Sequence, residues 1–271
     1  MQDKNVAILG CGNIGSAIAN GLVKSGMYKP KQLFLTRRSE DSLKKFSERG
    51  FNTTANNVEA VKNSDIIILA ITPRQLDGVI DEIRNVLDEK RHVVLSVVSG
   101  ASIKQIKSHI QKKIPVVRVM PNTAIAIQES MTCISADEHD REALEVSKNI
   151  FDKLGKYVVI HEELMVPATA LCACGIAFFF RAIRAASQGG IEIGFHAEDA
   201  LFMAAQTAKG AAAMIIDGGA HPEGEVDKVT TPRGCTITGL NQMEHSGFSS
   251  SMIKGIVASA EKAKHLYSVD E

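Results

Sequence analysis

The feature that most restricts the fold of this chain is a glycine-rich segment close to its N-terminus. Residues Gly10–Gly15 match G-x-G-x-x-G, follow the apolar run Val6–Leu9 and open the helical run Ile14–Val23. In such a context the first glycine permits a tight turn, the second lets a pyrophosphate approach the backbone, and the third allows close helix–strand packing. The helix N-terminus then offers free N–H groups and a partial positive charge to the phosphates. The segment predicts a dinucleotide site; a glycine-rich turn without a ligand is the alternative.

The first 160 residues alternate short apolar runs with amphipathic stretches such as Gln75–Leu87 and Arg141–Leu154. The runs are continuous and rich in β-branched residues, which is typical of strands covered on both faces. They are Val6–Leu9, Leu33–Leu35, Ile66–Ile71, Val93–Val98, Val116–Val119 and Val158–Ile160. The alternation predicts an α/β fold with a doubly wound parallel sheet over residues 1–161.

The pattern changes at about residue 162, where strand-like runs disappear and alanine-rich segments such as Ala204–Met214 dominate. Phe178, Phe179 and Phe180 are consecutive, so on a helix they spread over about 200° of its circumference. An apolar surface of that width must be covered on most sides. We therefore expect residues 162–271 to form an all-α domain that is also the subunit interface of a homodimer or a higher homo-oligomer.

Composition excludes several classes of partner. The chain carries 31 Lys+Arg and 31 Asp+Glu, and binding to a phosphate backbone needs a cationic excess, so no nucleic-acid partner is expected. The longest charge-free stretch, Leu164–Phe180, is shorter than the roughly 20 residues that span a bilayer, and no secretory signal is visible. We expect it to be a buried helix, with no membrane partner. The five cysteines are an odd number without zinc spacing, which favours a reducing cytoplasm and no bound metal.

Two arginines follow the second predicted strand, as Thr36-Arg37-Arg38. An NAD site usually places Asp or Glu there to hold the ribose 2′-hydroxyl, whereas guanidinium groups match the geometry of a 2′-phosphate. The pair therefore predicts NADPH as the cofactor, with NADH bound more weakly. In the rival interpretation Glu40 or Asp41 holds the ribose of NADH.

Residues 229–240, Val-Thr-Thr-Pro-Arg-Gly-Cys-Thr-Ile-Thr-Gly-Leu, resemble the signature of the pyrroline-5-carboxylate reductases, which catalyse the last step of proline biosynthesis. Further segments fall in the order expected for that family: Asn57–Glu59, Arg118–Thr123, Thr169–Leu171 and Gly247–Phe248. The resemblance implies an N-terminal Rossmann domain, a helical C-terminal dimerisation domain, and hydride transfer from NADPH to the C=N of 1-pyrroline-5-carboxylate. Two alternatives stay open: another NADPH-dependent imine or β-hydroxyacid reductase, and a non-catalytic NADP-binding protein.

The glycine motif, the arginine pair and the resemblance together indicate the site residues. The expected cofactor-binding residues are Leu9, Gly10, Cys11, Gly12, Asn13, Ile14, Gly15, Arg37, Arg38, Asn57, Ala70, Ile71, Thr72, Pro73 and Asn122. The expected substrate-binding residues are Thr231, Gly234, Cys235, Thr236 and Glu162. Thr236 is the expected catalytic residue, because its hydroxyl can hydrogen-bond to the ring nitrogen as the imine becomes an amine.

The chain departs from the family pattern at several places. Thr72 stands where the family commonly has Lys, and Cys172–Ala177 replaces a motif usually written Ser-Gly-Ser-Gly-Pro-Ala. Arg233 and Cys235 replace Gly and a small residue or Thr. The motifs of α/β-hydrolases, zinc proteases and P-loop proteins are all missing from the sequence, so those catalytic classes have no support.

Overall fold

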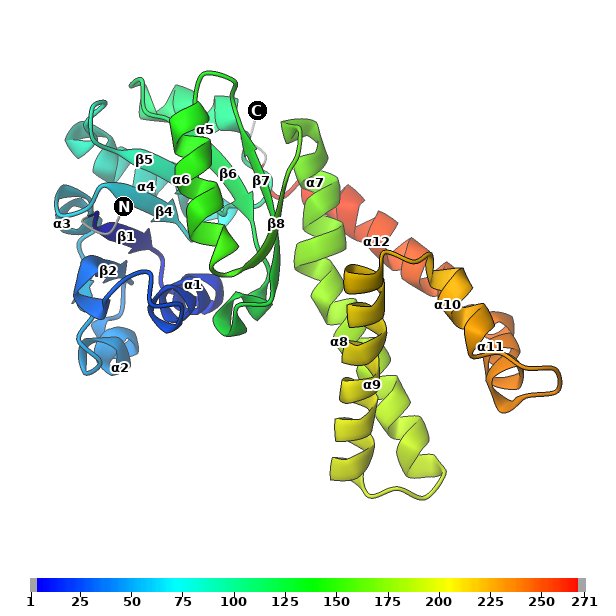
Figure 1. Cartoon of the computed structure of the whole chain (residues 1–271). Helices are drawn as coiled ribbons and strands as arrows, with labels where there is room; N and C mark the ends of the chain where they lie inside the picture. The colour runs from blue at the N-terminus through cyan, green and yellow to red at the C-terminus, as the bar shows by residue number, and fades with distance from the viewer. Residues whose placement is uncertain (1–3, 268–271) are drawn as a thin grey trace. The chain divides into compact units, whose positions relative to one another are not determined.

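The computed structural model describes residues 4–267, which form two compact units (Figure 1). The first unit runs to Cys174 and takes in the chain again from Ser259, whereas the second comprises Gly175–Ala258. The division predicted between residues 161 and 162 therefore falls inside the first unit. Strand structure ends at Val159 and helical structure begins at Glu162, so the change of secondary structure comes earlier in the chain than the change of unit.

An eight-stranded sheet is the centre of the first unit, with the strand order β3-β2-β1-β4-β5-β6-β7-β8. The strands are β1 (Val6–Leu9), β2 (Leu33–Thr36), β3 (Asn52–Thr54), β4 (Ile66–Leu69), β5 (Val93–Ser96), β6 (Val116–Met120), β7 (Ser130–Ala136) and β8 (Gly155–Val159). The order reverses at β1, which pairs in parallel with both β2 and β4. The predicted doubly wound sheet is confirmed. One departure is that β7 runs antiparallel to β6, while β8 is parallel to β7.

The strands β3 and β7 did not show in the sequence because neither is a continuous apolar run. In β7 the hydroxyl residues Ser130 and Thr132 are buried, and Thr132 Oγ1 donates to Ser130 Oγ at 3.1 Å. Ser130 also accepts a hydrogen bond from the backbone of Asn122. Its partner across the ladder is Gly155, whose φ of +141° and close approach to the Ser130 backbone leave no room for a Cβ. Polar strands of this kind need tertiary hydrogen bonds to be buried.

Helices cover both faces of the sheet. Alternate residues of each strand point to opposite sides, so each strand contributes side chains to two cores. Val6 and Ile8 of β1 share one core with helices α1 (Asn13–Lys24) and α6 (Arg141–Asp152). Ala7 and Leu9 enter the other core. That second core is formed with α3 (Asn57–Lys62), α4 (Leu76–Ile83) and α5 (Ile103–Ile110). The short helices α2 (Lys44–Ser47) and α7 (Met165–Ala168) and a π-helical turn, η7 (Thr169–Cys174), complete the first unit.

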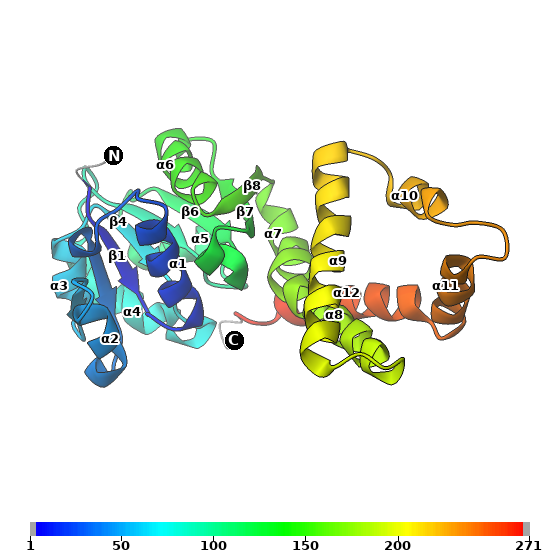
Figure 2. The same cartoon turned by 60° about the horizontal axis from the view of Figure 1, so that its bottom comes forward.

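The second unit is helical, as predicted. Its helices are α8 (Gly175–Glu192), α9 (Ala197–Gly218), α10 (Pro222–Lys228), α11 (Cys235–His245) and α12 (Phe248–Lys264), whose last turns belong to the first unit. Helices α8 and α9 lie side by side as a hairpin (Figure 2). Large apolar side chains project from this hairpin, and Phe179 and Phe180 are 61% and 60% exposed in the single chain.

The expectation that Leu164–Phe180 is a buried helix is wrong for the single chain. Leu171, Phe179 and Phe180 are all exposed, because no segment of the described chain covers this face. The continuous helical run Glu162–Glu192 is long and apolar enough to cross a membrane by length and composition, and only 28% of its most apolar window is buried. One such helix is weak evidence for a membrane span, since core helices of soluble proteins have the same character.

Candidate active site

The glycine-rich turn is shaped by the backbone that surrounds it. Gly10 has a φ of +92°, and a Cβ there would lie 2.6 Å from the Ala70 carbonyl oxygen. A Cβ at Gly15 would lie 2.5 Å from the Gly10 carbonyl oxygen. At Gly12, by contrast, a Cβ would meet nothing within 4 Å. The first and third glycines thus allow β1, α1 and the end of β4 to approach one another, while the second leaves open space over the start of α1.

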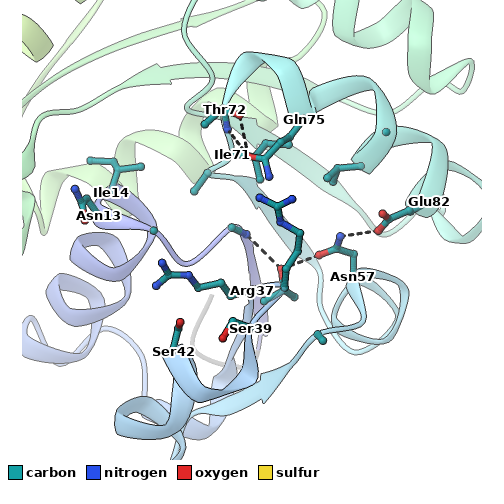
Figure 3. Close-up of a pocket in the computed structure, with 18 of the residues that line it drawn as sticks. Asn13, Ile14, Arg37, Ser39, Ser42, Asn57, Ile71, Thr72, Gln75 and Glu82 are labelled. Carbon is teal, nitrogen blue, oxygen red and sulfur yellow. Dashed lines mark hydrogen bonds between the residues drawn. The ribbon is translucent and has the colours of Figure 1, made fainter.

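A cavity of about 810 Å³ opens at the point where the strand order reverses (Figure 3). It lies beyond the carboxyl ends of β1, β2 and β4, which is where doubly wound sheets bind their ligands. The lining residues are Gly10, Gly12, Asn13, Ile14, Thr36, Arg37, Arg38, Ser39, Ser42, Ala55, Asn57, Ala70, Ile71, Thr72, Gln75, Gly78, Val79, Glu82 and Thr123. Its volume is in the range of cofactor sites.

Most of the expected cofactor residues line this cavity; the exceptions are Leu9, Cys11, Gly15, Pro73 and Asn122. Leu9, Cys11 and Gly15 are buried beneath the turn, so they support the wall rather than form it. Ser39 and Ser42 lie beside Arg37 in the segment after β2 and were missed, although the same strand-end argument could have found them (Figure 3). Gln75 and Glu82 come from the segment after β4 and carry no comparable signal in the sequence.

A chain of hydrogen bonds runs along the floor of the cavity. Thr36 Oγ1 accepts from the Gly10 amide at 3.3 Å and donates to Asn57 Oδ1 at 2.7 Å. Asn57 Nδ2 donates in turn to Glu82 Oε2 at 2.6 Å (Figure 3). These bonds use both ends of the Asn57 amide and fix the turn relative to α3 and α4.

The electrostatic character of the cavity comes from the loop after β2 and from the helix α1. Arg37 and Arg38 are exposed at its edge, and α1 has no acidic residue in its first turn. The first amides of a helix have no intrahelical acceptor, so α1 presents them to the cavity. Asp41 does not line the cavity, and the side chain of Glu40 lies outside the described part of the structure. The arrangement suits a ligand with several phosphate groups.

Glu162 has a structural task that the sequence did not reveal. Its Oε1 accepts from the Ile103 amide at 2.6 Å, at the start of α5, and from Arg118 Nη1 at 3.2 Å. The Arg118 side chain on β6 is only 4% exposed; burial lowers its pKa, and the attraction of Glu162 acts in the opposite direction. Arg118 Nη2 is buried without a hydrogen-bond partner among the described residues. Glu162 thus ties β6 to the start of α5, and its contact with substrate stays a prediction.

The segment predicted to bind substrate forms the start of α11 in the second unit. The Gly234 amide donates to the Thr231 carbonyl at 2.9 Å, and Gly234 is the N-cap residue of α11 without any side-chain cap. Thr236 is exposed in the first helical turn, and its hydroxyl does not cap the helix, because the N-cap position belongs to Gly234. Thr238 Oγ1 instead donates to the Gly234 carbonyl at 3.1 Å. Helix α11 has no acidic residue in its first turn, so its first amides suit an anion such as a carboxylate.

Arg233 adopts a left-handed backbone conformation with a φ of +61°. The pyrroline-5-carboxylate reductase signature has Gly at this position, and only Gly takes that conformation without a steric cost. The exposed residue Arg233 therefore has a backbone conformation that glycine adopts without strain, and this conformation costs about 1 kcal/mol of stability.

The fold and the cavity place the chain in the class of dinucleotide-binding proteins, with a Rossmann-type unit that carries the cavity and a second, helical unit. The family model for pyrroline-5-carboxylate reductase dimerisation matches residues 162–266. A second model, described as NADP oxidoreductase coenzyme F420-dependent, matches residues 5–100.

Similar proteins agree with these matches. The chain is 54% identical to pyrroline-5-carboxylate reductase 1 of Dictyostelium discoideum over 98% of its own length, and it spans half the length of that relative. It is 50% identical to pyrroline-5-carboxylate reductase 2 of the same organism, over 97% of this chain and 93% of the relative. A crystal structure of pyrroline carboxylate reductase from Plasmodium falciparum, with NADP bound, has the same fold: TM-score 0.90, 24% identity, and coverage of 99% and 100% of the two chains. This chain belongs to the pyrroline-5-carboxylate reductase family, and the resemblance seen in the sequence is confirmed.

The ion pair of Glu162 leads to a prediction about stability. Replacement Glu162→Gln keeps the shape of the side chain but removes the charge beside the buried guanidinium of Arg118. We expect the free energy of unfolding, measured with urea, to fall by about 1–3 kcal/mol. The matched control is Glu163→Gln, because Glu163 is the exposed neighbour, and it should change that free energy by less than about 0.5 kcal/mol. Equal stability of the two variants would contradict the anchoring role.

Proposed function

We propose that this chain transfers a hydride from NADPH to the C=N carbon of 1-pyrroline-5-carboxylate and so forms L-proline, the last step of proline biosynthesis. The observation that carries the proposal is the identity of 50% over 97% of the chain to a protein named pyrroline-5-carboxylate reductase 2. The substrate is a small molecule, and the oxidised product of the cofactor is NADP⁺. Five free thiols in the described part of the chain favour the cytoplasm as the compartment.

The residues around the cavity fit NADPH. The open space over Gly12 and the first amides of α1 would hold the pyrophosphate, because no Cβ blocks the approach. Arg37 and Arg38 would bind the 2′-phosphate, together with the hydroxyls of Ser39 and Ser42. When bound, the cofactor supplies the hydride, which is chemistry that no side chain can provide.

The helical unit would hold the substrate. In this proposal the amides at the start of α11, around Gly234 and Cys235, bind the ring carboxylate. The hydroxyl of Thr236 hydrogen-bonds to the ring nitrogen. A cyclic imine is basic enough to bind partly as the iminium, so the carbon is already electrophilic and the nitrogen already carries its proton. The chain then needs no strong acid, and holding the ring in the reactive position accounts for much of the rate.

The chain forms homo-oligomers, which is the role of the family domain that covers residues 162–266. We propose that the α8–α9 hairpin is the interface, because its exposed side chains include Phe179, Phe180, Phe202 and Ile216. Burial of this surface against a second copy would remove from water the apolar area that the single chain leaves exposed.

The cofactor proposal is tested with purified protein, pyrroline-5-carboxylate and either nicotinamide, by following the absorbance of the reduced cofactor. We expect the wild type to prefer NADPH. Replacement of both Arg37 and Arg38 by Ala should raise the KM for NADPH roughly 10- to 150-fold, the loss expected for charge-assisted hydrogen bonds, and leave the KM for NADH nearly unchanged. A wild type that prefers NADH would refute the arginine argument and favour Glu40 or Asp41.

The role of Thr236 is tested by Thr236→Val, which keeps the branched shape and deletes the hydroxyl. The turnover number should fall roughly 10- to 100-fold, while the affinity for NADPH barely changes. Thr238→Val is the matched control, since it removes a hydroxyl from the same helix that is used only for the Gly234 carbonyl. Similar turnover of the two folded variants would leave Thr236 without a catalytic role.

The assembly is tested by light scattering coupled to size-exclusion chromatography. We expect at least a dimer, with an interface above roughly 2,000 Å², as obligate apolar interfaces require. Phe180→Asp places a charge in the centre of the exposed apolar face and should shift the population towards single chains. A stable, active wild-type monomer near 29.2 kDa would contradict this assembly.

A further inference from the structure

Two cysteine thiols meet inside the first unit. Cys133 Sγ on β7 and Cys172 Sγ in the π-helical turn η7 are 3.8 Å apart, although 39 positions separate them in the chain. Cys133 is buried and Cys172 is half-buried, and both pack among the apolar side chains of Met120 and Met165. All five cysteines lie in the described part of the chain, and this is the pair in which one thiol hydrogen-bonds to another.

The other cysteines have different surroundings. Cys11 Sγ is 3.3 Å from the hydroxyl of Ser16, and Cys235 is exposed at the start of α11. Cys174 is two residues beyond Cys172 in the same turn, and burial raises the pKa of its thiol. Neither Cys133 nor Cys172 is among the residues expected to bind the cofactor or the substrate.

We propose that Cys133 and Cys172 are a redox-sensitive pair, which a peroxide converts to an intramolecular disulfide that weakens cofactor binding through Asn122. The sulfur atoms must move from 3.8 Å to about 2.05 Å apart, the length of a disulfide bond. Cys172 lies in a single π-helical turn, which is an irregular segment that can adjust more easily than the regular strand β7.

The chemistry balances with a peroxide as the oxidant. Cys172 is half-buried whereas Cys133 is buried, and the hydrogen bond between the two thiols lowers the pKa of Cys172, so Cys172 is the group that attacks. Its thiolate attacks one oxygen of hydrogen peroxide, the O–O bond breaks, and the leaving hydroxide becomes water after taking up a proton. The resulting sulfenic acid is then attacked by the sulfur of Cys133, whose proton leaves with the sulfenic hydroxyl as a second water. Two thiols and one peroxide thus give one disulfide and two waters.

Asn122 connects the pair to the cofactor cavity. Its Nδ2 donates to the carbonyl oxygen of Cys172 at 3.4 Å, and its Oδ1 accepts from the Ala124 amide at 3.0 Å. It thereby caps the short helix Thr123–Ile127, and Thr123 lines the cavity. Any shift of the Cys172 backbone on disulfide closure acts first on the Asn122 amide and then on the cavity wall. This consequence rests on the proposed cofactor role of the cavity.

The test begins with the disulfide itself. Purified wild type is treated with hydrogen peroxide, the remaining thiols are alkylated, and the protein is digested without reductant for mass spectrometry. We expect a cross-linked peptide pair that contains Cys133 and Cys172 and that dithiothreitol separates. Cys172→Ser should lose this cross-link, whereas the matched control Cys174→Ser should form it as the wild type does. Alkylation of both Cys133 and Cys172 in peroxide-treated wild type, or a cross-link that persists between other cysteines, would overturn the proposal.

The second measurement is the dissociation constant for NADPH, from nicotinamide fluorescence, before and after oxidation. The oxidised wild type and Cys174→Ser should bind NADPH roughly 2- to 10-fold more weakly, the effect of losing one hydrogen bond, and dithiothreitol should restore the affinity. The affinity of Cys172→Ser should not respond to peroxide. An unchanged dissociation constant in the cross-linked protein would refute the coupling through Asn122. Neither measurement uses the imine substrate, so a failure of the proposed reductase activity would be seen separately.

Discussion

The close approach of backbone at the end of β1 is the constraint on which the rest of the first unit depends. Gly10 turns the chain within van der Waals distance of Ala70, and Gly15 lets α1 pack against that same turn. Because a Cβ at either position would overlap with main-chain atoms, the turn, α1 and the end of β4 can meet only with glycine there. The amides of α1 reach the cavity as a consequence of this packing. The position of the cavity is therefore set by the close backbone contacts at Gly10 and Gly15 rather than by charged residues.

The charged and polar residues around this turn have two separate roles: those at the rim are placed to bind a ligand, and those at the floor support the cavity wall. Arg37 and Arg38 stay exposed at the rim, where a ligand can reach them. The floor is made of paired groups, since Thr36, Asn57 and Glu82 satisfy one another through short hydrogen bonds. Thr36 is buried and Asn57 is half-buried, so these hydrogen bonds offset the cost of removing their polar groups from water.

The helical unit depends on a different balance. Its hairpin α8–α9 keeps large apolar side chains at its surface, which a single chain cannot cover. In the proposed dimer another copy would remove this surface from solvent, and folding and assembly would then be coupled in this part of the molecule. The same unit contains a strained residue, Arg233, which has the left-handed backbone conformation that glycine adopts without strain.

The sequence by itself determined the features that come from local patterns. Short apolar runs placed β1, β2, β4, β5, β6 and the last part of β8, and the order of strands and helices fixed the doubly wound class. The glycine spacing located the turn, and the arginines after β2 located one end of the cavity. These signals are local because the geometry of a turn or a strand end depends on neighbouring residues.

Tertiary structure decided what depends on partners far along the chain. The polar strands β3 and β7 are held by their neighbours in the sheet, and no apolar run in the sequence predicts them. Glu82 reaches the cavity floor only because α4 lies beside α3, and Glu162 is an anchor only because Arg118 is buried next to it. The contact of Cys133 with Cys172 arises in the same way, across two elements that the sequence places apart. Hydrogen bonds and ion pairs between distant residues have no period or spacing in a sequence, so only the folded chain brings them together.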